Sequence, residues 1–306
     1  MSEPIPIWPG EEISLGDRSV FVRSAPGSNG SGPAEAGLYV HGLAGSATNW
    51  TDLMAQLSDV LAGDAIDLPG FGYSPPPPDR DYSVDAHART VAQVIERRGR
   101  GPVHLFGNSL GGAVATRLAA RRPDLVRTLT LISPALPDLR PRLGPSRILV
   151  ASVPGVGEWA LRRVLAVPPE RRVKASLEMI YSDPSLMHPA RLRELIAEIR
   201  RRDALDYSAP AVLGAARGIV SEFLRRGRRS LWRDAARVQA PTLLLYGGRD
   251  RIVDARMAGR AYRIFPHARV VVLPGVGHVA QMERPELVAR EFRALLADSR
   301  EAGLAV

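Results

Sequence analysis

Short apolar segments alternate with amphipathic segments along most of the chain. The apolar segments read as buried strands, and the segments between them repeat apolar residues at helical spacing. Strands that are apolar on both faces and separated by amphipathic helices are typical of a mostly parallel sheet covered by helices on both faces. The predicted fold class is therefore α/β. We expect strands at 38–42, 64–70, 103–108, 128–133, 241–247 and 269–275, and helices at 48–59, 83–98, 113–122, 254–264 and 285–298.

The pattern differs at the start and in the middle of the chain. Segments 11–15 and 18–23 flank a Gly-Asp pair, which predicts an opening β-hairpin. Residues 135–236 keep helical periodicity and show no convincing strand. Since 306 residues fit either one domain with a large insertion or two small domains, both arrangements are open. We expect an α/β core at 1–134 and 237–306 and a helical cap at 135–236, folded over the sheet edge where ligands bind.

A serine lies between glycines at the end of the strand 103–108, in the sequence GNSLGG at 107–112. A strand that turns sharply into a helix forces its apical residue into strained backbone angles, where neighbouring side chains collide. Gly107 and Gly111 remove these collisions and leave the Ser109 hydroxyl exposed at the start of a helix. A chain with 28 glycines can produce this pattern by accident, but the flanking strand and helix favour a nucleophilic Ser109.

A serine nucleophile needs a general base, and His278 is the best candidate among the six histidines. It lies in a glycine-rich loop directly after the strand 269–275, on the sheet edge that holds Ser109. His104 lies inside a strand and is expected in the core. We assign the remaining histidines to the surface: His87, His188 and His267.

The base in turn needs a carboxylate to orient it. Asp250 comes first after the strand 241–247, at the end of GGRD. Asp254 is a better candidate for capping the next helix, and Asp138, after the strand 128–133, is a third choice. The chain order Ser109, Asp250, His278 is the order of a hydrolase triad in which each residue follows its own strand.

The reaction also needs hydrogen-bond donors for the oxygen that gains charge in the transition state. The backbone amide of Leu110, at the start of the helix after Ser109, is one candidate. The loop HGLAG at 41–45 supplies the other, because Gly42 lets the chain bend so that the amide of Leu43 points into the site. We expect His41 to hold this loop by hydrogen bonds and not to act as a base.

These motifs together resemble the α/β-hydrolase superfamily over nearly the whole chain. The matching segments are HGLAG with Trp50 behind it, DLPGFGYS at 67–74, GNSLGG, GGRD, and GVGHVAQMERPE at 275–286. The resemblance implies a serine hydrolase of carboxylic esters, with Gly42 and Asn108 beside a small-molecule substrate. We expect no cofactor and no metal, because the sequence shows no metal-binding cluster and no cofactor motif. Serine at the nucleophile position argues against the haloalkane dehalogenase and epoxide hydrolase branches, which need a carboxylate there.

Two alternatives remain open. Asn108 makes the nucleophile turn similar to that of the meta-cleavage C–C bond hydrolases, which act on dienoic ketones and also carry helical lids. Those enzymes tend to have HGxGPG, an asparagine and a tryptophan where this chain has HGLAG, Asp52 and Val279. The second alternative is a ligand receptor or signalling protein of the same fold with little turnover.

The formal net charge of +9 is concentrated in the cap. Residues 137–236 hold 18 arginines and Lys174 against 11 acidic residues. We interpret most of these arginines as solvated helix faces. The alternative is that the excess positive charge attracts anionic or amphiphilic substrates. We expect no nucleic-acid partner. The arginines singled out are Arg162, Arg163, Arg171, Arg172, Arg200, Arg201, Arg202, Arg225, Arg226, Arg228 and Arg229.

The chain contains no cysteine, which excludes disulfide bonds, a thiolate nucleophile and cysteine-rich metal sites. It also lacks dinucleotide-binding and phosphate-loop motifs. The first residues have neither a basic start nor a long apolar run, and no segment approaches the length of a membrane span. We therefore expect a cytoplasmic protein.

Overall fold

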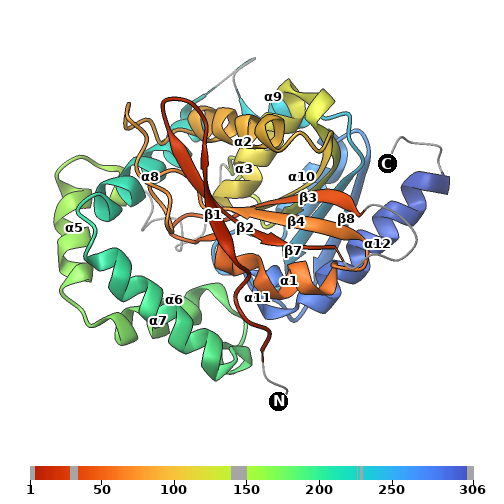
Figure 1. Ribbon diagram of the computed structural model, residues 1–306. Coiled ribbons are helices and arrows are strands. Elements are labelled where there is room, and N and C mark those ends of the chain that lie inside the picture. Colours follow the sequence, from red (N-terminus) through yellow and green to blue (C-terminus); the bar gives the residue numbers. More distant parts are fainter. Residues whose placement is uncertain (1–3, 28–33, 139–149, 226, 228–229, 302–306) are drawn as a thin grey trace.

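The computed structural model describes residues 4–27, 34–138, 150–225, 227 and 230–301. Within these residues, eight strands form one sheet in the order β1-β2-β4-β3-β5-β6-β7-β8 (Figure 1). The strands are β1 (Gly10–Ser14), β2 (Ser19–Ala25), β3 (Glu35–Val40), β4 (Leu61–Ile66), β5 (Val103–Asn108), β6 (Val126–Ile132), β7 (Thr242–Gly247) and β8 (Ala268–Leu273).

The sheet is parallel except at its start. Strands β1 and β2 pair as an antiparallel hairpin, and β2 is also antiparallel to β4. The remaining neighbours, from β4 to β8, are parallel. The hairpin turns at Gly16, whose φ of +92° suits glycine. The predicted mostly parallel sheet and its opening hairpin are confirmed.

Helices cover both faces of the sheet. The short helix η1 (Ala47–Trp50), α1 (Thr51–Gln56), α11 (Ala280–Glu283) and α12 (Pro285–Glu301) cover one face. The other face carries α2 (Val84–Arg98), α3 (Leu110–Arg121), the one-turn helix η2 (Pro123–Leu125), α9 (Leu231–Ala235) and α10 (Met257–Ile264). None of the described helices is long and apolar enough to cross a lipid bilayer.

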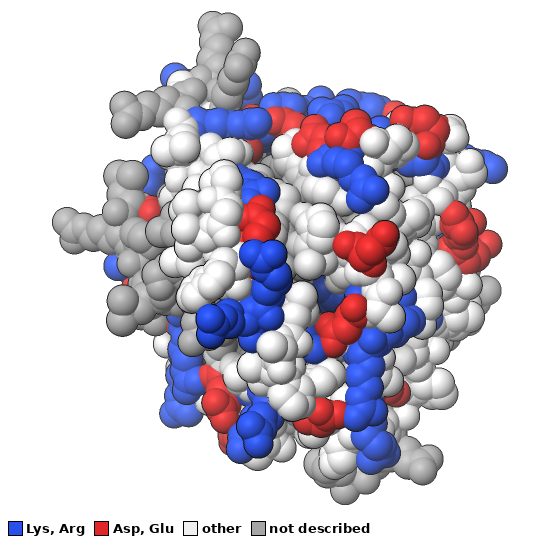
Figure 2. All heavy atoms as spheres, turned by 90° about the vertical axis from the view of Figure 1, so that its left-hand side faces the viewer, with Lys and Arg blue, Asp and Glu red and all other residues white. Residues whose placement is uncertain are grey.

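The described residues between β6 and β7 form helices and no strand. They comprise α5 (Val156–Leu165), α6 (Pro169–Ile180), η3 (Pro184–Leu186), α7 (Pro189–Asp203), α8 (Ser208–Leu224) and α9. Helices α5 to α8 lie together at one side of the sheet, at the left of Figure 1. Figure 2 shows this side from outside, with basic side chains spread over it and acidic ones often next to them.

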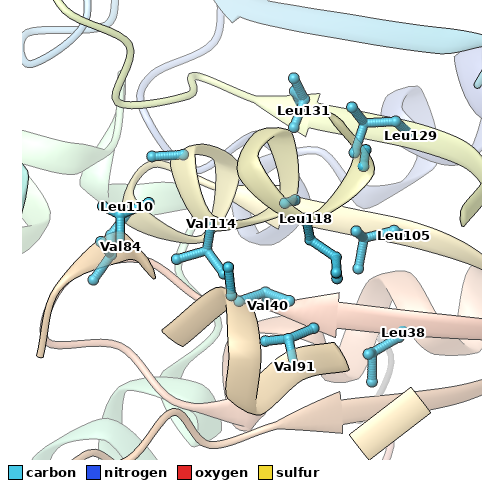
Figure 3. Packing of buried hydrophobic residues seen from close by; sticks show 14 of the residues in the cluster. Leu38, Val40, Val84, Val91, Leu105, Leu110, Val114, Leu118, Leu129 and Leu131 are labelled. Carbon is cyan, nitrogen blue, oxygen red and sulfur yellow. The ribbon is translucent and has the colours of Figure 1, made fainter. Parts of the chain in front are cut away.

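Helix α3 is anchored by a stripe of apolar side chains. Leu110, Val114 and Leu118 are spaced four residues apart, so they lie on one helix face, and they are buried against strands that include Val40 and Leu105 (Figure 3). Complete burial of a leucine side chain contributes about 1.5–3 kcal/mol. This packing fixes the helix whose first turn follows Ser109.

A buried arginine joins α3 to three other helices. The Arg117 side chain has no exposed surface, and its guanidinium forms ion pairs with Asp85 on α2, Glu222 on α8 and Asp234 on α9. The Nη1 to Asp85 and Nη2 to Glu222 distances are both 2.6 Å. Buried charges are tolerated only when they are paired, so these four side chains require one another. Helices α8 and α9 also contribute apolar side chains to the same core as α3.

The expectation that His87 lies at the surface is wrong. His87 is fully buried on the inner face of α2, beside the rings of Phe71 and Tyr82. These two residues belong to the long loop after β4, which covers α2 in a way that helix periodicity does not predict. Both ring nitrogens of His87 lack a hydrogen-bond partner among the described residues, and burial lowers its pKa to about 4. His104 is buried as expected, and His267 is exposed.

Candidate functional site

Ser109 occupies a strained turn between β5 and α3. Its φ of 53° and ψ of −114° lie outside the regions that most side chains adopt. A Cβ on Gly107 would lie 2.4 Å from the carbonyl oxygen of Gly111, and one on Gly111 would lie 2.1 Å from that of Val40. Both positions therefore require glycine. The serine itself is half-buried at the carboxyl edge of the sheet.

His278 and Asp250 meet at the same sheet edge. Asp250 follows β7, His278 follows β8, and His278 Nδ1 lies 2.8 Å from Asp250 Oδ2. The second oxygen, Oδ1, accepts the backbone N–H groups of Ile252 at 2.7 Å and Val253 at 3.0 Å. Burial raises the pKa of Asp250, but the charge and hydrogen bond of His278 and the Ile252 amide outweigh burial and hold this pKa below its usual value. Asp250 is therefore an ionised acceptor for the N–H of His278 Nδ1.

The other two candidate carboxylates have different partners. Asp138 forms an ion pair with Arg256 at 2.6 Å. Asp254 accepts the backbone N–H of Arg256 at 3.0 Å, at the start of α10. Of the three aspartates that the sequence leaves open, the structure brings Asp250 to His278.

Asn108, the last residue of β5, is buried beside Ser109. Its side-chain nitrogen donates to the backbone carbonyls of Ile132 at 3.0 Å and His278 at 3.1 Å. The side chain therefore ties the Ser109 turn to the loop that holds His278. No sequence pattern indicated this contact, because the two segments are 170 residues apart.

The loop 41–45 lies directly against the serine. A Cβ on Gly42 would be 3.2 Å from Ser109 Cβ and 3.1 Å from Asn108 Oδ1. His41 is buried behind this loop, with Nδ1 2.7 Å from the Gly42 carbonyl and Nε2 accepting the N–H of Leu68 at 3.0 Å. Burial lowers the pKa of His41 to about 3, so the ring is neutral, donates from Nδ1 and holds the loop. Leu43 in this loop and Leu110 at the first position of α3 stay predictions as oxyanion donors.

Helix α7 also contacts this loop, which sequence analysis did not anticipate. Arg202 donates to the Ala44 carbonyl at 2.7 Å, and Glu198 Oε2 accepts the hydroxyls of Ser46 at 3.0 Å and Thr48 at 3.2 Å. The Arg202 side chain is only 11% exposed. A helix of the central segment therefore braces the residues that follow Leu43.

The cap arginines are less solvated than expected. Arg162, Arg163 and Arg171 are exposed, in agreement with the expectation. The expectation of a solvated side chain is wrong for Arg202 and Arg201. The guanidinium carbon of Arg201 lies 3.8 Å from the centroid of the Tyr73 ring, and its Nη2 donates to the Gly72 carbonyl. These two side chains point from α7 toward the core. The presence of charged residues on an amphipathic helix did not indicate that they would be covered.

Other cap arginines form ion pairs. The pairs are Arg172 with Asp203, Arg200 with Glu170, and Arg225 with Asp85 and Glu222. Arg226, Arg228 and Arg229 lie outside the described residues. Figure 2 shows basic and acidic side chains next to one another over this face.

A cavity of about 480 Å³ lies between α7 and the segment that contains η1 and α1. Its lining includes Asn49, Tyr181, Leu195 and Met282, and it does not include Ser109, Asp250 or His278. The described residues contain no cluster of three or more His, Asp or Glu side chains that could hold a metal ion.

Comparison with known proteins matches this architecture to one family. The model of the alpha/beta hydrolase fold family matches residues 38–285. Lipase 3 of Moraxella sp. strain TA144 is 26% identical over 290 residues, covering 92% of this chain and 82% of the lipase. The 2-hydroxy-6-oxononadienedioate/2-hydroxy-6-oxononatrienedioate hydrolase of Cupriavidus pinatubonensis is 26% identical over 294 residues, covering 94% and 93% of the two chains.

A further relative is longer than this chain. The acetyltransferase component of the acetoin cleaving system of Cupriavidus necator is 29% identical over 268 residues, and the match covers 87% of this chain but 63% of that protein. Among solved structures, one assigned as a lipase from Acinetobacter baumannii AYE has a TM-score of 0.78 and 23% identity, covering 96% of this chain and 92% of its own. With its parallel sheet, glycine-flanked serine turn and family match, the chain belongs to the alpha/beta hydrolase fold family.

Proposed function

We propose that the protein is a serine hydrolase that cleaves carboxylic esters through an acyl-enzyme intermediate. The observation that carries the proposal is the hydrogen bond between His278 and the ionised Asp250, at the sheet edge that also holds the strained Ser109 turn. A serine, a histidine and a carboxylate that follow strands β5, β8 and β7 at one edge of a parallel sheet are the components of nucleophilic acyl transfer.

In the proposed mechanism, the Ser109 hydroxyl attacks the ester carbonyl while His278 Nε2 accepts its proton. The backbone amides of Leu43 and Leu110 stabilise the negative oxygen of the tetrahedral intermediate. His278 then donates the proton to the departing alcohol, which leaves the acyl group on Ser109. Water, activated by the same imidazole, releases the acid. The close approach of Gly42 to Ser109 supports the place of Leu43 in this scheme.

We also propose that residues 135–236 form a cap that covers a small-molecule substrate. The helices α5 to α8 and the contacts of α7 with the loop after Leu43 support this. Substrate then enters between the cap and the sheet edge.

A second function, hydrolysis of a C–C bond in dienoic ketones, is kept because the C. pinatubonensis relative covers nearly the whole chain. Asp52 distinguishes this chain from the pattern of such enzymes. It forms an ion pair with Arg191 of α7 at 2.6 Å, so this carboxylate holds the cap segment to α1. Ester cleavage is therefore the preferred assignment.

The test is a panel of p-nitrophenyl esters from acetate to decanoate, assayed beside a dienoic meta-cleavage product. We expect turnover of esters and covalent labelling by a fluorophosphonate, both lost in Ser109→Ala. Labelling that survives in Ser109→Ala would overturn the nucleophile assignment. Faster turnover of the dienoic ketone than of any ester would favour the C–C hydrolase, and no turnover above the Ser109→Ala background would favour a receptor.

A further inference from the structure

Glu283 is a buried carboxylate that the proposed mechanism does not use. It is the last residue of α11 and is 6% exposed. Its Oε2 accepts the backbone N–H of Gly277 at 2.7 Å. Its Oε1 accepts the backbone N–H of Ser182 at 3.1 Å and contacts the Ser182 hydroxyl. One carboxylate thus joins the residue before His278 to the segment that follows α6.

The segment after α6 lies flat against the histidine loop. The backbone N–H of His278 donates to the carbonyl of Ile180 at 2.7 Å. A Cβ on Gly277 would lie 2.5 Å from that carbonyl oxygen and 2.6 Å from the nitrogen of Ser182. The two backbones therefore touch at Gly277, and only a glycine fits between them.

The backbone amides of Gly277 and His278 are consecutive, and each is held from outside its own loop. Glu283 holds the first and Ile180 holds the second, while the Ser182 contact of Glu283 keeps Ile180 in place. The Ser182 hydroxyl also lies 2.7 Å from the Gly275 carbonyl, so its single proton is shared between that oxygen and Glu283. Within the described residues, Glu283 is the charged side chain that accepts hydrogen bonds from both the histidine loop, at Gly277, and the segment after α6, at Ser182.

We propose that Glu283 is a positioning residue that sets the place of the His278 imidazole by clamping its loop to the segment 180–182. The proposal rests on the proposed function, because it concerns proton transfer at His278. Hydrogen bonds from backbone amides to a carboxylate are strong, and their loss would leave two buried donors unsatisfied. The histidine loop would then shift, and a displacement of about 1 Å of a reacting group is enough to cost about 100-fold in rate.

The test compares Glu283→Gln with Glu291→Gln. Glutamine has the size of glutamate, but its NH2 group cannot accept a hydrogen bond. One of the two backbone N–H groups, of Gly277 or of Ser182, therefore loses its acceptor. Glu291 on α12 is a matched control, since it is 7% exposed and binds Arg269 and Arg290 away from the histidine loop. With p-nitrophenyl esters, we expect Glu283→Gln to lower kcat about 10- to 100-fold with KM changed less than about 2-fold, and Glu291→Gln to change neither.

Ser182→Ala is the second variant, and it keeps the backbone contact while it removes the hydroxyl. We expect a smaller loss of kcat, about 2- to 5-fold, again without a change in KM. Circular dichroism and thermal unfolding establish that each variant is folded. A folded Glu283→Gln protein with wild-type kcat overturns the proposal, as does an equal loss of kcat in Glu291→Gln. Should Glu283→Gln not fold, an unchanged kcat in Ser182→Ala overturns it.

The same assays separate this proposal from the proposed function. Ester turnover that persists in both Ser109→Ala and His278→Ala contradicts the serine hydrolase itself. Turnover that is lost in those two variants but unchanged in Glu283→Gln leaves the hydrolase standing and contradicts only the positioning role.

Discussion

At the scale of single residues, the site depends on a carboxylate that stays charged while nearly fully buried. Asp250 is 1% exposed, and burial alone would favour its neutral form. Two backbone amides and the His278 ring offset this effect. The carboxylate therefore favours the imidazole tautomer that the proposed mechanism needs.

Asp250→Asn is expected to lower kcat about 10³- to 10⁴-fold, because the amide stabilises the wrong tautomer of His278. Asp138→Asn should leave kcat within about 3-fold, because Asp138 pairs with Arg256 and not with the histidine. Steady-state kinetics with an activated ester measures both. An active Asp250→Asn protein beside an inactive Asp138→Asn protein would move the carboxylate to the loop after β6.

His87→Leu is expected to raise the free energy of unfolding at pH 7 by about 1 kcal/mol, because leucine replaces a buried ring with two unpartnered nitrogens. The folded-state pKa of about 4 lies below the usual 6.5. The contribution of the neutral ring is therefore complete above pH 6.5 and is lost as the pH falls toward 4. Urea unfolding at several pH values should show a shallower acid decline in His87→Leu. A variant that is less stable than wild type at pH 7 would reveal an unrecognised partner of the ring.

At the scale of elements, the nucleophile turn depends on close backbone contact between α3 and β3. Gly111 touches the Val40 carbonyl, and Gly107 touches Gly111. The apolar stripe of α3 holds the helix at this distance, so a side chain at Gly111 cannot be accommodated by moving the helix without breaking that packing.

Gly111→Ala should therefore destabilise the protein by about 3 kcal/mol or more and abolish ester turnover, since the new methyl group would displace β3 or α3. The control is Gly259→Ala, at an exposed position of α10 where the nearest atom would be 3.9 Å away. This change should stabilise by up to about 1 kcal/mol through helix propensity. Chemical denaturation compares them, and equal effects would show that steric contact at Gly111 is unimportant.

Elements with a local signature were predictable from the sequence. The strands, most helices and the nucleophile turn follow from apolar periodicity and glycine spacing, which act within a few residues. Ser109, Asp250 and His278 all lie at the carboxyl edge, because parallel strands end at one edge, and Asp250 contacts His278 there. The burial of His87 and Arg202 and the Glu283 clamp were not predictable, because each depends on a segment that is distant in the sequence and that covers or contacts these residues only in the folded chain.

At the scale of the whole molecule, the described helices between β6 and β7 pack in two different ways. Helices α8 and α9 contribute Ala211, Ile219, Leu231 and Trp232 to the main apolar cluster. Helices α6 and α7 instead form a smaller cluster of their own with Val279. The region 135–236 therefore contains one part that completes the core and one part that lies over it.

Replacing residues 137–236 by a short linker should prevent folding, because Arg117 would lose two of its carboxylate partners and the core would lose α8 and α9. Removing one partner of a buried ion pair already costs about 3–5 kcal/mol. Replacing only residues 156–203 should leave a folded protein with a lower kcat, because Ile180 and Ser182 no longer hold the His278 loop. This protein should also no longer distinguish acyl chain lengths. Circular dichroism and the ester panel test both deletion variants, and a folded, stable protein after the longer deletion would contradict this division.

The Arg117 cluster also restricts how the molecule can open. Since α8 is tied by buried charges to the helix behind Ser109, its backbone amides should exchange with deuterium only when the entire fold unravels. Helices α5 to α7 carry no such tie to α3 among the described residues, so their amides should exchange through smaller fluctuations. Access to the serine would then depend on movement of α5 to α7 while α3 and α8 stay fixed, and substitutions of Asp85 or Glu222 would loosen α8 without contacting the substrate.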